Sequence, residues 1–139
     1  MIEKIMISSS KELKENPRIV VVQKLYGHHL NEDSAIIFPK HRYKKFIKDV
    51  VNGTIERKEL IQEMINNELK DSINLNKTEL MIKLMIMAAI YEFMYMHKTP
   101  VKVVINEYLK VADFFIKDSQ KGFLNAILDK ASKVARVNE

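Results

Sequence analysis

The chain has 139 residues, of which 47% are hydrophobic and 29% charged, the balance of a globular domain with one core rather than of a disordered segment. It has no cysteine, which excludes disulfides, thiol catalysis and thiolate metal sites. The formal net charge of +5 is a modest positive excess that attracts polyanions, although many basic proteins bind no nucleic acid.

The beginning of the chain predicts a polar lead-in followed by a helix. Residues 1–15 have no clean hydrophobic period, so we expect a lead-in there and a single helical domain over residues 16–139. Asn16 and Pro17 are a good helix start, because asparagine caps a helix and proline suits its first position. We expect this helix to run to Leu30.

After a predicted loop over residues 31–39, apolar residues recur with a helical period. A single apolar stripe occupies residues 43–54 and passes through Gly53 without losing phase. Gly53 is therefore predicted to be a close-packing point inside a helix rather than its end. A shorter apolar stripe follows at residues 60–69, and the polar interval 56–59 is expected to separate two helices.

The next predicted helix is apolar on nearly every side. Asn76 is predicted to cap it, with Glu79 three residues on in the position of a capping box. Residues 77–97 then form a helix whose stretch 84–91 has no polar face, which is typical of a helix at the centre of a bundle. We expect this helix to end near Lys98.

Two amphipathic helices are predicted in the last part of the chain, over residues 100–115 and from about Ser119 onward. Because few glycines and prolines are available for turns, the pattern predicts an all-α fold of six to seven helices around one central apolar helix. The apolar run 84–96 is too short for a membrane span of about 20 residues, and residues 1–16 lack the core of a secretory signal. We therefore expect a cytoplasmic protein.

Two stretches of the sequence resemble the NusB family. VVVQKLY, at residues 20–26, is similar to the signature of the family's first helix. Residues 88–130 are similar to the family's carboxy-terminal half, and the matching residues occur in the family's order: Tyr91, Glu92, Pro100, Lys102, Val103, Ile105, Asn106, Glu107, Phe123, Asn125, Leu128, Asp129 and Lys130. This second match is highly specific, whereas residues 31–75 resemble the family only in outline.

The resemblance implies a helical fold of two three-helix subdomains and a role in transcription antitermination and in ribosomal RNA transcription and processing. It implies binding to the boxA element of ribosomal RNA leader transcripts, in a heterodimer with the ribosomal protein NusE. The RNA polymerase elongation complex would be reached indirectly through that heterodimer. Some members of the family pair with themselves, so a homodimer is left open.

The candidate RNA-binding residues come from the beginning of the first helix and from the region before the last helix. A protein that reads single-stranded RNA needs cations for phosphates and exposed planar groups for unstacked bases. If the two helices lie side by side, these groups are supplied by Lys14, Arg18, Lys117, Asp118, Ser119, Lys121 and Phe123.

For several of these residues a structural role is an alternative. The helical phase of Phe123 points toward the core, whereas the resemblance implies a partly exposed ring at a helix start. Asp118 or Ser119 could bind base edges or the 2′-hydroxyl, or could only cap the last helix. The lysines could be ordinary solvated surface.

The beginning of the first helix carries less positive charge than the family usually has. Members often open this helix with a cluster of arginines, but here the equivalent cations are only Lys14 and Arg18, and Glu15 opposes them. Each lost phosphate contact lowers the affinity for RNA. We therefore expect RNA binding to be weak without the partner.

Gln23 and Tyr26 are the candidate contacts to NusE. They lie three residues apart on one side of the first predicted helix, and Tyr26 matches a family position near the NusE surface. An amphipathic tyrosine suits an interface, although tyrosine is also common in cores. A core position of Tyr26 is therefore the alternative.

Motifs of catalysis and metal binding are missing from the sequence. It has no phosphate-binding loop, no dinucleotide glycine motif and no nucleophile elbow. His28 and His29 are adjacent and point apart on a helix, so we expect no metal site and no cofactor, and predict that the chain is not an enzyme. The alternatives to RNA binding are a protein-interaction scaffold and a ribosomal RNA docking module without independent RNA binding.

Overall fold

The computed structural model describes residues 10–136, and all regular structure in this range is helical. Residues 1–9 of the predicted lead-in and residues 137–139 lie outside it, while the end of the lead-in forms a short helix. The elements in chain order are α2 (Ser10–Glu15), α3 (Pro17–Leu30), α4 (Lys44–Glu56), α5 (Lys58–Glu68), η1 (Leu75–Lys77), α6 (Leu80–Tyr95), α7 (Val101–Phe115), η2 (Asp118–Gln120) and α8 (Lys121–Ala135). The prediction of an all-α fold with six to seven helices is thus confirmed.

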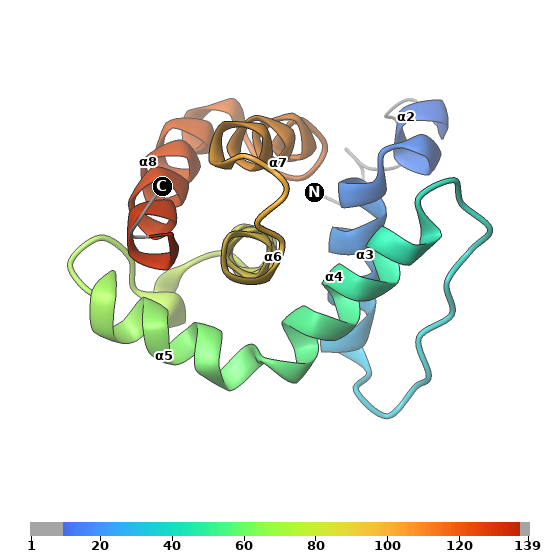
Figure 1. Cartoon of the computed structure of the whole chain (residues 1–139), viewed down its shortest axis with the longest axis horizontal. Helices are drawn as coiled ribbons and strands as arrows, with labels where there is room; N and C mark the ends of the chain where they lie inside the picture. The colour runs from blue at the N-terminus through green and yellow to red at the C-terminus, as the bar shows by residue number, and fades with distance from the viewer. Residues whose placement is uncertain (1–9, 137–139) are drawn as a thin grey trace.

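Helix α6 lies at the centre of the molecule. Figure 1 shows it end-on, and it contacts α3, α4, α5, α7 and α8. Most of its residues are buried, as the missing polar face in the sequence predicted. Helices α6, α7 and α8 pack pairwise against one another, while α4 packs against both α3 and α5. Within residues 10–136 we find no helix with the length and apolar character needed to span a membrane.

The predicted start of the first long helix is confirmed. The side-chain oxygen of Asn16 accepts hydrogen bonds from the backbone nitrogens of Arg18, at 3.0 Å, and of Ile19, at 3.3 Å. Pro17 is the first residue of α3. This cap fixes the direction in which the side chain of Arg18 leaves the first turn.

Gly53 is a close-packing point, as predicted. It is buried inside α4, and a Cβ atom at this position would overlap the ring of Tyr91 on α6. The polar interval 56–59 separates α4 from α5, with Arg57 between them. The glycine therefore lets α4 lie against the central helix.

The predicted cap of the central helix is wrong. Asn76 lies within η1, and its backbone nitrogen donates to the side chain of Asn74 at 2.9 Å, so Asn74 is the capping residue there. Glu79 has extended backbone, with ψ at 142°, and α6 begins one residue later at Leu80. The polar residues before α6 thus form a separate short turn rather than its first turn.

The end of α6 is set by a residue far away in the sequence. The helix ends at Tyr95, before the predicted end near Lys98. Arg136, which directly follows α8, is buried against this end. Its guanidinium donates at 2.7–3.0 Å to the backbone oxygens of Glu92, Phe93, Met96 and Thr99. The carbonyls of Glu92 and Met96 also accept backbone hydrogen bonds from Met96 and Thr99, so Arg136 reinforces the turn between α6 and α7.

Candidate nucleic-acid and partner interface

Arg18 is largely buried and paired, whereas the sequence pattern placed it among the cations available to RNA phosphates. The residue is only 9% exposed, and its guanidinium binds both carboxylate oxygens of Glu92. Nε lies 3.0 Å from Oε2, and Nη2 lies 2.7 Å from Oε1. The guanidinium also lies 4.7 Å from the ring centroid of Phe46. Arg18 therefore joins α3 to α6 inside the core.

Tyr108 completes this buried cluster from α7. Its hydroxyl donates to Oε2 of Glu92 at 2.6 Å. Burial, reinforced by the negative charge of Glu92, raises the pKa of Tyr108 well above its usual value. Burial alone would lower the pKa of Arg18, but the hydrogen bond and charge of Glu92 outweigh it and raise that pKa. Arg18 and Glu92 thus form a buried ion pair, and the phenol of Tyr108 stays neutral beside it.

The second group of candidate residues lies at η2 and the start of α8. Lys117, Asp118 and Ser119 are exposed, and within residues 10–136 the side chains of Asp118 and Ser119 make no hydrogen bond. The residue that precedes α8 is Gln120, and no side chain caps that helix. The capping alternative for Asp118 and Ser119 is therefore not observed.

Phe123 lies in the first turn of α8 with 40% of its surface exposed. Of the two alternatives from the sequence, the structure thus shows the partly exposed ring. The next residue, Leu124, is fully buried, so the inward face of α8 begins one position later. Phe123 and the η2 residues together present one aromatic ring beside polar and cationic side chains.

Lys121 is engaged by a neighbouring carboxylate. Its Nζ lies 2.6 Å from Oδ1 of Asp113 on α7. This hydrogen bond to Asp113 raises the pKa of Lys121 above its usual value. The charge of Lys121 is thus partly balanced within the protein.

The first and last long helices are not direct neighbours in the arrangement. Helix α7 packs against both α3 and α8, and Figure 1 shows α7 between them. A groove of about 780 Å³, called here the α7 groove, runs along this side of α7. It is lined by Glu15, Asn16, Pro17, Arg18, Tyr43, Phe46, Thr99, Glu107, Lys110, Asp113 and Phe114. Three carboxylates and two cations line it, so the groove has no excess of positive charge.

Comparison with known proteins decides the family. A model of the NusB family matches residues 15–133. The chain belongs to the NusB family. Transcription antitermination protein NusB of Maricaulis maris is 26% identical, over 96% of this chain and 99% of that protein. The protein of the same name from Rickettsia bellii is 27% identical, over 90% of this chain and 93% of its own length.

The structural comparison agrees with the NusB fold. The solved structure of T. maritima NusB superposes with a TM-score of 0.73 at 22% identity. The match covers 84% of this chain and 88% of that one. NusB proteins are transcription antitermination factors, and the fold described above is theirs.

In this NusB chain, the candidate partner residues lie on the second half of α3. Gln23 and Tyr26 are both half-buried, and Tyr26 packs against the core with part of its surface. Gln23 lines a cavity of about 290 Å³ between α3 and the following loop, which Ile37 also lines. Leu30 and Ile37 are large apolar side chains that remain exposed near these residues. This end of α3 therefore presents a mixed polar and apolar surface.

A second group of exposed cations lies just before and within the beginning of α4. The segment 40–48, KHRYKKFIK, contains five lysine and arginine residues, and all five are exposed. In the sequence, Lys40 and Arg42 follow the predicted loop over residues 31–39, and the other three cations lie on the polar side of the apolar stripe over residues 43–54. A run of cations with an aromatic residue inside it was the signal that could have revealed them.

The described residues of this chain include no cluster of side chains that could bind a metal ion. Between residues 10 and 136, no three histidine, aspartate or glutamate side chains gather where they could hold a metal ion. His41 instead accepts a hydrogen bond at Nδ1 from the backbone nitrogen of Tyr43, at 2.9 Å. That histidine thus shapes the turn that leads into α4.

Proposed function

We propose that this chain acts in transcription antitermination by binding boxA-like single-stranded RNA together with the ribosomal protein NusE. In this role it works in the cytoplasm and reaches the RNA polymerase elongation complex indirectly. Membership of the NusB family supports the proposal. The observation that carries it is the exposed ring of Phe123 beside Lys117, Asp118 and Ser119.

The chemistry of this surface fits an unstacked nucleotide. An exposed aromatic ring stacks on a base, and stacking contributes roughly 1–3 kcal/mol per base. Lys117 supplies a positive charge for a phosphate, while Asp118 and Ser119 have free acceptors and a hydroxyl for base edges or the 2′-hydroxyl. Exposed planar, cationic and polar groups within residues 117–123 fit the requirements of single-stranded RNA.

NusE is needed in this proposal because two expected cations are already paired. Arg18 binds Glu92, and Lys121 binds Asp113. The remaining cations of the original set, Lys14 and Lys117, give a thin electrostatic contribution to RNA binding. The proposed NusE surface is the end of α3, with Gln23 half-buried there and apolar side chains exposed nearby.

An RNA titration with and without NusE, at two salt concentrations, tests the proposal. Phe123→Ala is expected to weaken RNA binding by roughly 5- to 100-fold, the equivalent of one lost stacking contact. Leu60→Ala is the matched control, because Leu60 is an equally exposed apolar residue on α5. Equal RNA affinity of the two variants, or no joint binding of RNA and NusE by the unaltered chain, would contradict the proposal.

A second candidate function is a protein-interaction scaffold that binds NusE without RNA. The pairing of Arg18 and Lys121 with carboxylates favours it, since both positive charges are partly balanced. The same titration separates the two functions. A scaffold binds NusE with an affinity that RNA does not change, whereas the proposed RNA-binding factor binds each more tightly in the presence of the other.

A further inference from the structure

We propose that the segment 40–48, together with Lys14, forms a second RNA contact that holds the sugar-phosphate backbone next to the element bound at Phe123. We call this surface the basic turn, and define it by Lys14, Lys40, Arg42, Tyr43, Lys44, Lys45 and Lys48. The inference rests on the proposed function, because it extends the path of the same RNA strand across the molecule.

The positive charge of the basic turn is largely unbalanced. Lys45 pairs with Asp49, at 2.8 Å between Nζ and Oδ2. Within residues 10–136, Lys40, Arg42 and Lys44 form no ion pair. These three exposed cations follow one another at every second position, just before and at the start of α4. A polyanion can neutralise them without first breaking a bond inside the protein.

An aromatic ring within the charge cluster favours nucleic acid over an acidic protein. Tyr43 is 46% exposed, and the guanidinium of Arg42 lies 5.4 Å from its ring centroid. Stacking platforms flanked by cations bind single strands, because each base offers a face and each phosphate a charge. The bond from the backbone nitrogen of Tyr43 to His41 holds the turn that presents the ring.

A second hollow, of about 530 Å³, lies between α2 and the segment that precedes α4. It is lined by Lys14, Glu15, Lys40, His41, Arg42 and Tyr43. Three of these residues are cations and one is a carboxylate, so the hollow has an excess of positive charge. Lys14 and Lys40 come from separate segments of the chain, and the fold brings them to one site.

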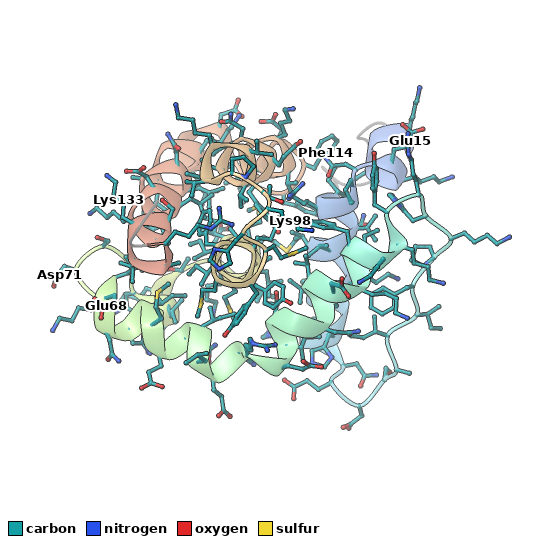
Figure 2. The ribbon with its side chains drawn as sticks, in the orientation of Figure 1. Glu15, Glu68, Asp71, Lys98, Phe114 and Lys133 are labelled. Carbon is teal, nitrogen blue, oxygen red and sulfur yellow. The ribbon has the colours of Figure 1, made fainter. Side chains whose placement is uncertain are left out.

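The hollow lies next to the α7 groove. Glu15 and Tyr43 line both, so the two cavities meet at these residues. Asp113, which also lines the α7 groove, pairs with Lys121, two residues before Phe123. Figure 2 labels Glu15 at the end of α2 and Phe114 on α7, which line the groove from different elements.

The distribution of charge along this path indicates where the protein binds the RNA strand. Among the charged residues that line the α7 groove, three carboxylates outnumber the two cations, so the groove does not attract phosphates. Cations gather instead at the basic turn and beside Phe123. The strand is therefore held at both ends of the path, and the basic turn replaces phosphate contacts that Arg18, buried with Glu92, does not make.

Because the basic turn contacts the phosphates of the RNA in this proposal, we expect it not to distinguish between base sequences. Lysine and arginine contacts to the backbone position a strand but do not specify its bases. The length of RNA next to the boxA-like element is therefore expected to matter for affinity, while its base composition is not.

The test compares a short RNA that holds only the boxA-like element with a long RNA. The long RNA carries flanks of about ten nucleotides, within the usual site size of single-strand binding surfaces. The triple variant Lys40→Ala, Arg42→Ala and Lys44→Ala is expected to bind the long RNA roughly tenfold more weakly at low salt, with the salt slope reduced by about 2. Its affinity for the short RNA and its thermal unfolding remain those of the unaltered chain.

The matched control removes three other exposed lysines, by Lys58→Ala, Lys70→Ala and Lys77→Ala, on α5, the turn after it and η1. If this control weakens long-RNA binding as much as the basic-turn triple, net charge alone is responsible and the inference is overturned. The inference also fails, while the proposed function stands, if the basic-turn triple binds both RNAs like the unaltered chain. If the unaltered chain binds neither RNA, with or without NusE, the proposed function itself fails.

Discussion

At the scale of single residues, one buried carboxylate joins three helices. Glu92 on α6 receives the guanidinium of Arg18 from α3 and the hydroxyl of Tyr108 from α7. A buried ion pair gains little over a packed apolar pair, because both charges lose their hydration. Removing only one partner of the pair lowers stability strongly, because the remaining charge stays buried without compensation.

Replacing Glu92 tests this asymmetry. Glu92→Gln leaves the guanidinium of Arg18 buried opposite a neutral amide, and we expect the free energy of unfolding to fall by about 3 kcal/mol. The double variant Arg18→Met and Glu92→Leu removes both charges and should recover much of the loss. Urea unfolding at neutral pH measures both. Lys45→Ala, which breaks an exposed pair, is the control and should change nothing measurable.

Tyr108 makes the stability of the fold depend on alkaline pH. Its pKa is raised in the folded chain, so above about pH 10 an unfolded tyrosine loses its proton while the buried one keeps it. The unfolded state then binds fewer protons, and stability falls by up to about 1.4 kcal/mol per pH unit until the raised pKa is passed. Below pH 10 this contribution to stability is fully present.

The variant Tyr108→Phe isolates that effect. It loses the hydrogen bond to Glu92, which lowers stability at neutral pH by roughly 1.5–3 kcal/mol. It also loses the ionisable group, so its stability should decline less steeply between about pH 9 and 11. Urea titrations across this range measure the slope for both proteins. Identical slopes would show that Tyr108 ionises equally in the folded and unfolded chains.

At the scale of helices, Gly53 determines how closely α4 approaches α6. Alanine normally stabilises a helix by about 1 kcal/mol relative to glycine. At Gly53 the added Cβ meets the ring of Tyr91, which is half-buried and lies 5.2 Å from the ring of Tyr95 between centroids. Gly27 on α3 is exposed, and a Cβ there meets nothing within 4 Å.

The two glycines should therefore respond to alanine in opposite directions. Gly27→Ala is expected to raise the free energy of unfolding by up to about 1 kcal/mol. Gly53→Ala is expected to lower it by about 1–3 kcal/mol, because the ring must shift in a packed interface. Thermal and urea unfolding compare them directly. Stabilisation by both substitutions would mean that Tyr91 moves aside freely.

The position of a helix could be predicted from the sequence where its cap or its apolar stripe lies within or directly beside that helix. The cap at Asn16 and the apolar stripe through Gly53 are local patterns, and both predictions are confirmed. The ends of α6 were not predictable in this way. Its start was misplaced because Asn76 belongs to the short turn that Asn74 caps, and its end depends on Arg136, whose guanidinium arrives from the far end of the chain.

At the scale of the whole molecule, the candidate site was predictable in chemistry but not in geometry. The residues at η2 and Phe123 were candidates because their types and spacing resemble the family, and the structure shows that they are exposed. The sequence gives no sign that Glu92, 74 positions away, would take the guanidinium of Arg18 into the core. The run of cations at residues 40–48 is visible in the sequence itself, whereas its closeness to Lys14 comes only from the fold.

The proposed RNA surface, at η2 and α8, and the proposed NusE surface, at the end of α3, belong to one folded chain. We therefore expect the binding of RNA and the binding of NusE to affect each other. If NusE raises the affinity for RNA by some factor, RNA must raise the affinity for NusE by the same factor. Tyr26→Ala removes a half-buried ring at the end of α3 and leaves η2 and α8 unchanged. We therefore expect it to weaken NusE binding while RNA binding in the absence of NusE is preserved.

Calorimetric titrations of each partner, with the other absent and then saturating, measure all four affinities of the Tyr26→Ala variant. The Phe123→Ala variant should show the reverse pattern, with weaker RNA binding and unchanged binding of NusE alone. Circular dichroism establishes that both variants keep the helical fold, which matters because Tyr26 packs partly on the core. If Tyr26→Ala weakens RNA binding without NusE as much as Phe123→Ala does, the two surfaces are not separate, and RNA must contact the end of α3.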